Sequence, residues 1–142
     1  MKQSKSVQII FLSLILSCFF LSGEVFAYKK SDLKKFKNTK KCIKCDLTDL
    51  NLSGSNLSGT NLSGVNLSGA NLSGANLSAA KLSGANLSKA KLNKADLWAA
   101  YLSGANLTDA DLTTTVLGET KLTRAILCRT KVAWGVENRD CK

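Results

Sequence analysis

Leucine occupies every fifth position over most of the chain, and this spacing dominates the hydrophobic pattern. Seventeen leucines keep one register without a break from Leu47 to Leu127. A small or short residue, most often alanine, stands two positions before each leucine, with Leu50 as the one large exception. Asn or Asp usually stands directly before the leucine, so the repeating unit is the one seen in Ala70-Asn71-Leu72-Ser73-Gly74.

A period of five residues fits neither a straight α-helix nor a flat β-strand. On a helix, successive leucines would be rotated by roughly 140°, and on a flat strand they would alternate between the two faces. The chain must therefore turn once per repeat. Within the short extended side of each repeat, a leucine and the residue two positions before it point into one interior. Ser and Gly after the leucine favour a corner, because glycine accepts positive φ and serine hydrogen-bonds to nearby backbone.

The unit Ala70-Asn71-Leu72-Ser73-Gly74 and its neighbours resemble the pentapeptide-repeat family over about residues 45–130. The resemblance implies an all-β fold, the right-handed quadrilateral β-helix, in which four repeats close one coil. The 17 repeats would then form about four coils, stacked about 4.8 Å apart. For function it implies a range of roles, because the family includes DNA mimics that protect topoisomerases, exported proteins and domains attached to enzymes.

The first 27 residues have the pattern of a cleaved export signal. A basic start precedes an apolar run over Ile9–Leu21, and the small-residue site Val25-Phe26-Ala27 follows. This run of 13 residues is shorter than the roughly 20 that span a bilayer. The apolar residues directly after Cys18 argue against a lipid-modified cysteine. We therefore predict an exported protein, periplasmic or secreted.

The rest of the chain divides into three segments: a basic N-terminal cap over residues 28–44, the solenoid over 45–127 and a C-terminal cap over 128–142. Capping is expected because the open ends of a solenoid expose unpaired strand edges. A short helix is predicted from Ser31 or Asp32 as the N-cap, with Leu33 and Phe36 on the face that covers the first coil. The alternative is a basic arm that binds a surface.

Four cysteines remain in the exported chain, and an oxidising compartment favours disulfides. Cys42 and Cys45 could form a redox motif, half of a zinc site or a structural clip. A redox motif lacks the expected βαβ context, and zinc would need Cys128 and Cys141, which should lie at the other end of the stack. We predict the pairs Cys42–Cys45 and Cys128–Cys141, with Trp134 as an apolar plug under the second, although three pairings are possible.

The formal charge of +10 is unevenly distributed. Residues 28–44 carry eight lysines and one aspartate, or +7, whereas residues 45–127 carry six basic and six acidic side chains and are neutral. Nucleic acid is therefore not an expected partner of the solenoid, and a DNA mimic would need a strongly negative surface. The lysine-rich segment offers weak contact with an anionic membrane or polyanion as an alternative.

Outward positions 20 residues apart should lie one above the other. Lys89, Asp109 and Arg129 would form one column of alternating charge, and Lys91, Asp111 and Lys131 another. Trp98 and Tyr101 replace the usual Ser and Asn and should point outward. The candidate interaction patch consists of these two aromatic residues and the lysines in nearby repeats: Trp98, Tyr101, Lys81, Lys89, Lys91 and Lys94. The competing interpretation is neutral variation at tolerant outward positions.

Catalysis is not expected. The sequence contains no histidine, which removes the commonest general base and the usual metal ligand beside cysteine. A narrow coil filled with leucine leaves no pocket of the size that enzymes use. The sequence predicts no catalytic site, no metal site and no cofactor site. The expected function is a non-enzymatic structural or interaction scaffold with a protein partner. The alternative is a DNA mimic that binds a topoisomerase, which charge and export disfavour.

Overall fold

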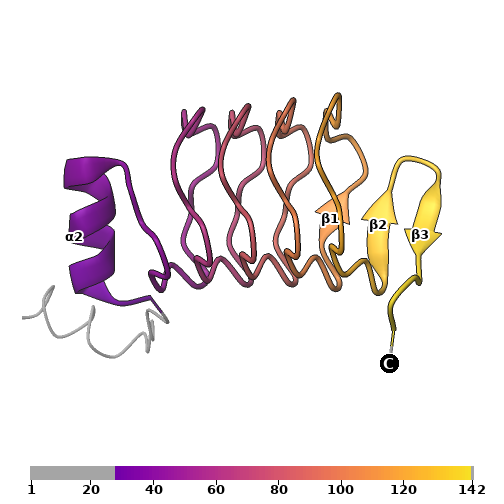
Figure 1. Cartoon of the computed structure of the whole chain (residues 1–142), viewed down its shortest axis with the longest axis horizontal. Coiled ribbons are helices and arrows are strands. Elements are labelled where there is room, and N and C mark those ends of the chain that lie inside the picture. The colour runs from indigo at the N-terminus through magenta and orange to yellow at the C-terminus, as the bar shows by residue number, and fades with distance from the viewer. Residues whose placement is uncertain (1–27, 142) are drawn as a thin grey trace, which may run out of the picture.

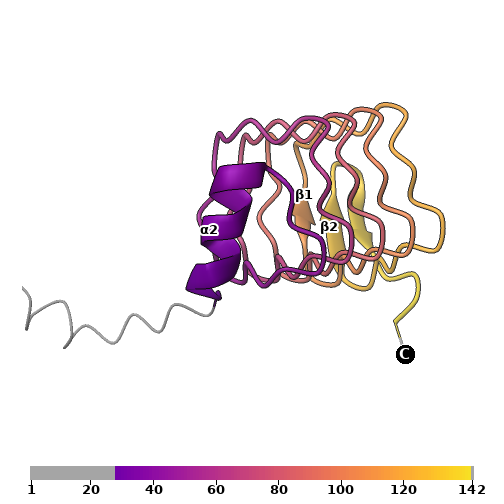
Figure 2. The same ribbon diagram turned by 60° about the vertical axis from the view of Figure 1, so that its left-hand side comes forward.

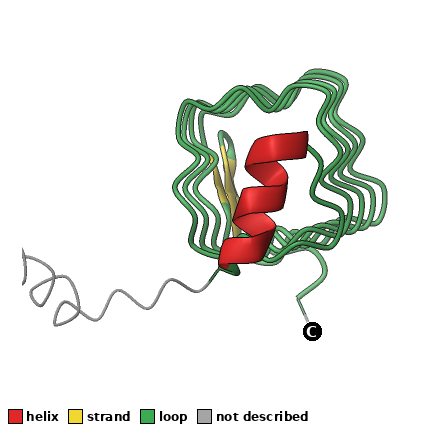
Figure 3. Ribbon diagram, turned by 90° about the vertical axis from the view of Figure 1, so that its left-hand side faces the viewer, coloured by secondary structure: helices red, strands yellow, loops and turns green. Residues whose placement is uncertain are grey.

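The computed structural model describes residues 28–141, so the predicted signal segment and Cys18 lie outside the described residues. The chain winds into a stack of similar coils with a helix at one end and a hairpin at the other (Figure 1). The named elements are α2 (Lys30–Thr39), β1 (Asp111–Leu112), β2 (Thr130–Val132) and β3 (Gly135–Glu137). Viewed along the stack, the coils superpose in a four-sided outline (Figure 3).

Each coil contains 20 residues, because parallel bridges join the residue directly before each leucine position to the residue 20 further along the chain. They begin at Lys41↔Asn61 and continue to Asn106↔Ile126, and β1 pairs with β2 in the same register. The backbone of each side bonds to both neighbouring coils: the Leu72 N–H donates to Lys91 O at 2.8 Å, and the Asn71 N–H donates to Leu50 O at 3.0 Å. The short sides thereby satisfy their backbone groups, as strands of a sheet do.

The corners follow from local residue chemistry. In one corner the Ala75 N–H donates to Leu72 O at 3.0 Å, and Gly74 has φ +67°. The Asn71 carboxamide oxygen accepts from the Ser73 N–H at 3.1 Å, which explains why asparagine is the usual residue before the leucine. Non-glycine residues also take positive φ at this corner position, Lys89 at 60° among them, so the repeat overrides a local steric preference.

The interior consists of stacked leucines and alanines, as the repeat predicts. The largest side chains in it, such as Leu72, Leu87 and Leu102, are completely buried, and so are alanines two positions before a leucine, such as Ala70 and Ala90. Leu50, the large exception at an alanine position, is half-buried and packs against the core in the first coil. Alternation within each short side therefore places both positions of the repeat inside.

Helix α2 covers the N-terminal mouth of the stack (Figures 2 and 3). Phe36 is buried and Leu33 packs against the core, as predicted. The predicted caps are wrong: Lys29 is the N-cap and makes no side-chain capping bond. The Asp32 carboxylate instead accepts from the Asp46 backbone N–H at 2.9 Å. This contact ties the helix to the first coil, since Asp32 meets an edge N–H that has no preceding coil to bond.

The first disulfide continues the repeat instead of preceding it. Cys42 and Cys45 are bonded with an S–S distance of 2.06 Å. The 20-residue register places Cys42 below Leu62, at a leucine position, and Cys45 two positions before Leu47, at an alanine position. Both cysteines are buried. The coil pattern therefore begins at Lys41, earlier than the predicted boundary at residue 45, because the disulfide fills the interior as leucine and alanine do elsewhere.

The C-terminal end is closed by a hairpin and the second disulfide. Strand β2 continues the coil register by pairing in parallel with β1, and β3 then returns antiparallel to β2. Cys128 and Cys141 are bonded with an S–S distance of 1.99 Å. The prediction of Trp134 as an apolar plug is wrong, because its side chain is 73% exposed and its indole N–H donates to Glu137 at 2.9 Å. The hairpin extends one side of the stack through backbone pairing, and no tryptophan ring fills the end of the last coil.

Candidate interaction surface

Two sides of the stack lie half a coil apart and face in opposite directions. The tyrosine face is one side of the coil, made of residues 41–44, 61–64, 81–84, 101–104 and 121–124. The opposite face lies ten residues, or half a coil, further along the chain in each turn, and consists of residues 51–54, 71–74, 91–94, 111–114 and 131–132.

Tyr101 lies at the centre of a column on the tyrosine face. Bridges place it between Lys81 in the coil before and Lys121 in the coil after. The Lys121 ammonium lies over the Tyr101 ring, 4.8 Å from its centroid, in cation–π geometry. Tyr101 is 40% exposed. The ring therefore points outward, as the sequence predicts, and the neighbouring lysine fixes its orientation.

Trp98 begins the corner that leads into the tyrosine face. Its side chain is 50% exposed. The register puts Gly118 in the next coil directly beside it, and a Cβ atom on Gly118 would lie 2.7 Å from the indole Cδ1. Glycine at 118 thus leaves the space that the indole ring occupies. The bulky side chain of Trp98 is therefore accommodated by a glycine 20 positions later in the chain.

The structure divides the six residues of the candidate patch. Lys81 and Tyr101 share the tyrosine face, with Trp98 at its corner. Lys91 belongs to the opposite face, where it bridges to Asp111, and Lys94 occupies a corner of that face. Lys89 lies in the column of Asp109 and Arg129, at another corner. Closeness in sequence suggested one patch, but residues ten positions apart point to opposite sides of a 20-residue coil.

Sequence reasoning missed the remaining cations of the tyrosine face. Lys121 and Arg124 follow Tyr101 and Gly104 by one coil, and Lys41 and Lys44 precede Asn61 and Gly64 by one coil. All four side chains are exposed. The column rule that paired Asp109 with Arg129 would have found them if it had been applied to Tyr101 and Gly104. With Lys81 they give this face five cations, and none of the residues that define it is acidic.

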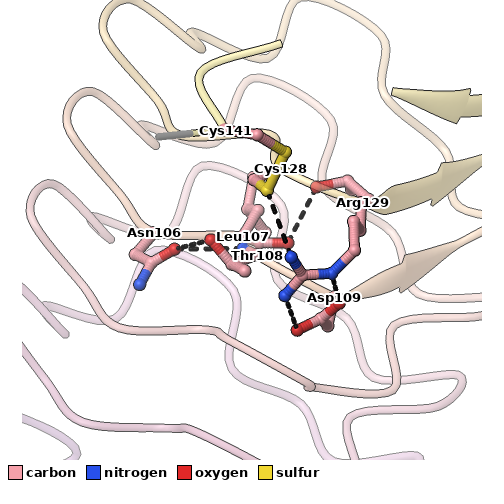
Figure 4. A network of polar contacts seen from close by, with 8 residues as sticks. Asn106, Leu107, Thr108, Asp109, Cys128, Arg129 and Cys141 are labelled. Atoms are coloured by element: carbon pink, nitrogen blue, oxygen red, sulfur yellow. Dashed lines mark hydrogen bonds and ion pairs between the residues drawn. A yellow bond between two sulfur atoms is a disulfide. The ribbon is translucent and has the colours of Figure 1, made fainter. Parts of the chain in front are cut away.

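The predicted column of Asp109 and Arg129 forms a bidentate ion pair beside the C-terminal disulfide (Figure 4). Arg129 Nε and Nη2 donate to the two Asp109 carboxylate oxygens at 2.6 and 2.7 Å. These hydrogen bonds, with the charges of Arg129 and Lys89, hold the pKa of Asp109 below its ordinary value. The pair links the last full coil to the residue next to Cys128, so it supports the cap rather than forming a reactive site.

The second predicted column pairs in a different way. Asp111 bridges to Lys91 and Lys131 through the backbone. Its carboxylate accepts hydrogen bonds from the Thr113 backbone N–H at 3.1 Å and from the Thr113 hydroxyl at 2.8 Å. Those bonds are the main cause of its lowered pKa, and the Lys131 charge adds to them. This carboxylate shapes a corner in place of the asparagine that other repeats use.

Two shallow hollows open near the N-terminal end. A groove of about 330 Å³ lies between α2 and the first coil and is lined by Leu33, Phe36, Leu52 and Leu57 among others. A second hollow of about 420 Å³ reaches the edge of the tyrosine face, and its lining includes Lys40, Lys41 and Lys81. The charged residues that line either hollow are all lysines. These linings suit an apolar segment and an anion, respectively.

The part of the chain that the structure describes contains no helix long and apolar enough to cross a membrane. Over the same residues, 28–141, no group of three or more His, Cys, Asp or Glu side chains is placed to hold a metal ion.

Comparison with known proteins identifies the family. The model for pentapeptide repeats matches residues 45–84 and 80–118. These ranges cover more than half of the chain, which therefore belongs to the pentapeptide repeat family. No curated protein sequence matches the chain at a significant level.

Solved structures of pentapeptide repeat proteins are similar to this chain. Rfr23 from the cyanobacterium Cyanothece 51142 is 25% identical, with a TM-score of 0.57, over 70% of this chain and 93% of Rfr23. HetL, involved in heterocyst differentiation regulation in Nostoc sp. strain PCC 7120, is 28% identical, with a TM-score of 0.36, over 68% of this chain and 51% of HetL. QnrB1, a plasmid-mediated fluoroquinolone resistance protein, is 18% identical, with a TM-score of 0.28, over 65% of this chain and 70% of QnrB1.

Proposed function

We propose that this pentapeptide repeat protein is an exported, non-enzymatic scaffold that binds a protein partner. We further propose that its coils wind right-handed and number about four, as the family resemblance implies. Rigidity supports the scaffold role, because coil after coil is held by backbone hydrogen bonds to both neighbours and by a continuous apolar core. Such a stack displays its outward side chains at fixed spacings, which reduces the entropy cost of binding.

The exposed Trp98 is the observation that carries the protein-binding proposal. It replaces a serine on an otherwise regular corner, its indole ring is half exposed, and Gly118 leaves room for it. Tryptophan is enriched among the few residues that dominate binding energy at protein interfaces. A ring held on a rigid corner loses little conformational freedom on binding, so this residue is the expected anchor.

Affinity capture with residues 28–142 as bait, in extracts of the cell that exports the protein, tests this function. The comparison uses the wild type, Trp98→Ser, Tyr101→Asn and, as a matched control, Ser78→Ala in the equivalent corner one coil earlier. We expect one protein to be captured by the wild type and the control, and its recovery to fall at least tenfold with Trp98→Ser. Equal recovery by all four baits would refute the role of Trp98.

Export is proposed from the first 27 residues and is tested separately. Fractionation of expressing cells, followed by sequencing of the mature N-terminus, should find the chain outside the cytoplasm and beginning at Tyr28. A full-length precursor in the cytosol would contradict export. A cytosolic location would favour the alternative of a topoisomerase partner. Strong inhibition of gyrase supercoiling by the purified protein would support that alternative and contradict the present proposal.

A further inference from the structure

The four sides of the coil carry very different charges. The tyrosine face bears five cations, Lys41, Lys44, Lys81, Lys121 and Arg124, and no acid. The opposite face carries Asp111 against three lysines, Lys91, Lys94 and Lys131. The side that precedes the tyrosine face has two acids, Asp96 and Glu119, and no cation. Within residues 45–127, whose charges sum to zero, the tyrosine face still carries three cations and no acid, so the neutral total hides a polarised cross-section.

The cations of the tyrosine face lie in two straight lines on a flat surface. Lys41, Lys81 and Lys121 belong to one column, and consecutive members are two coils apart, which is about 10 Å at strand spacing. Lys44 and Arg124 lie in the neighbouring corner column, at its two ends. The nearest acids by position are Asp46, two residues after Lys44, Glu119, two residues before Lys121, and Asp140, which lines a hollow with Arg124 at the C-terminal end. None of them interrupts the lysine column.

From this arrangement we propose that the tyrosine face docks the solenoid, with its axis parallel to the surface, on an anionic lipid bilayer. A plane is the shape that lets all five cations approach charged headgroups together. Attraction to a charged membrane fades within a Debye length, about 8 Å at physiological salt. On a flat rigid face no cation has to be brought closer by bending the chain.

Two further features match a bilayer surface. Tyr101 is exposed at the centre of the lysine column, and tyrosine is favoured at the boundary between lipid and water. The hollow whose lining includes Lys40, Lys41 and Lys81 opens at the N-terminal edge of the face, and no acidic residue lines it, which suits a headgroup phosphate. The face combines point charges for phosphate with one interfacial ring.

The size of the face favours a membrane over a protein at this side. The five stacked segments of the tyrosine face, at strand spacing and each about five residues wide, give a surface of roughly 400 Å². A stable protein interface buries about 800 Å² on each partner. Electrostatic attraction to a bilayer has no such threshold, because each cation adds about a fivefold increase in binding.

Binding of residues 28–142 to sedimented vesicles tests the proposal. One set of vesicles contains phosphatidylcholine alone, and the other contains phosphatidylcholine with about 30 mole per cent of the anionic lipid phosphatidylglycerol. We expect binding to the anionic vesicles only, weakened by raising the salt. The triple variant Lys81→Gln, Lys121→Gln, Arg124→Gln should lower the affinity by roughly tenfold to a hundredfold.

The matched control removes the same charge from the opposite face with Lys91→Gln, Lys94→Gln and Lys131→Gln. It should bind within about threefold of the wild type, since those cations face away from the lipid. Equal losses from the two triples would mean that net charge alone acts, and would overturn the proposal. Loss of binding only when the α2 lysines are replaced, or binding to a soluble polyanion but not to vesicles, would overturn it too. Circular dichroism of each triple confirms folding.

Membrane docking and protein binding can be separated. Trp98→Ser should lower partner capture at least tenfold and leave vesicle binding within about threefold, because the Trp98 ring lies toward Gly118 rather than in the lysine column. The tyrosine-face triple should do the reverse. One proposal can therefore fail while the other stands.

Discussion

The middle coils and the last coil are built from the same repeat, yet they are held differently. Between Leu67 and Leu107 the leucines are completely buried, and from Leu72 onward alanine fills the position two residues before each. In the last coil Leu117 and Leu122 are only partly buried, and Thr115 and Thr120 replace the alanines. The threonine hydroxyls donate to Leu92 O and Leu97 O in the preceding coil, both at 2.7 Å.

Hydrogen bonding explains the contrast. A middle leucine such as Leu97 donates its N–H to the following coil, at Val116 O, 2.9 Å away. The N–H groups of Leu117, Glu119, Leu122 and Arg124 find no such acceptor within residues 28–141, because no coil follows on those two sides. Interior residues are thus fixed from two directions and terminal ones from one. The repeat therefore specifies the middle coils, whereas the ends depend on individual contacts.

Leucine truncation should separate the two regions most strongly. Leu87→Ala leaves a cavity between two complete coils, so we expect a loss of about 3–4 kcal/mol in unfolding free energy. Leu122→Ala, in the half-covered last coil, should cost about 1–2 kcal/mol, because the site is already partly open to water. Urea unfolding followed by circular dichroism measures both. Equal losses of unfolding free energy in the two variants would contradict the difference in stability between the middle coils and the last coil.

Removal of the second disulfide should affect the cap and spare the middle. The Cys128–Cys141 bond closes a segment with a sequence separation of 13, which corresponds to about 3 kcal/mol of loop-closure stabilisation. The double variant Cys128→Ser, Cys141→Ser should lose amide protection in β2 and β3 but keep it at Leu72 and Leu92. Hydrogen exchange by mass spectrometry measures this. Loss of protection throughout the stack would show that the cap holds the whole solenoid.

Corner substitutions should give effects of opposite sign. Gly104 has φ +69° with open space where a Cβ would lie, so Gly104→Ala should cost about 1 kcal/mol from backbone strain alone. Lys94 has φ +61°, so Lys94→Gly should stabilise by about 0.5 kcal/mol. Thermal unfolding of both variants provides the measurement.

Thr114 supplies the control for that pair of corner variants, one coil beyond Lys94. It has no positive φ, and its hydroxyl accepts from the Lys94 N–H at 2.9 Å. Thr114→Gly should therefore destabilise, because it removes an acceptor without relieving strain. If Thr114→Gly and Lys94→Gly both raised the melting temperature, corner strain could not be the cause.

The smallest expected effect is on the pH dependence of the Asp109–Arg129 pair. Hydrogen bonds from Arg129 lower the folded-state pKa of Asp109. The stabilisation is therefore complete above the ordinary aspartate pKa and disappears as the pH falls through the lowered one. The Asp109 carboxyl carbon resonance should titrate below its ordinary range in the wild type, and Arg129→Gln should move it back. An ordinary pKa in the wild type would contradict the ion pair in solution.

The sequence predicts much of this structure because the repeat is a local rule. It identifies the buried leucines and alanines, and the 20-residue spacing correctly brings Asp109 to Arg129. The same counting, continued backwards from Leu47, would have placed Cys42 and Cys45 in the interior. It would also have collected Lys121 and Arg124 around Tyr101. Both the buried cysteines and the cations near Tyr101 could therefore have been predicted from the repeat.

The ends could not be predicted in the same way. Asp32 has the chemistry of a helix cap, but the structure uses it to bind the Asp46 N–H. Trp134 is apolar enough to serve as a plug, yet β3 folds back through backbone pairing and leaves the ring exposed. In both cases several partners compete for one side chain, and no period selects among them. The outcome depends on tertiary contacts that the sequence pattern does not encode.

Native-state hydrogen exchange on the wild type, resolved by residue, measures whether the middle coils are held from two sides and the last coil from one. We predict the highest opening free energies at the N–H groups that bond between middle coils, such as Leu72, Leu77 and Leu92. The N–H groups of Leu117, Glu119, Leu122 and Arg124 should exchange at nearly unprotected rates. Uniform protection from Leu47 to Leu127, or strong protection at Leu117 and Leu122, would contradict the view that coils are held from two sides in the middle and from one side at the end.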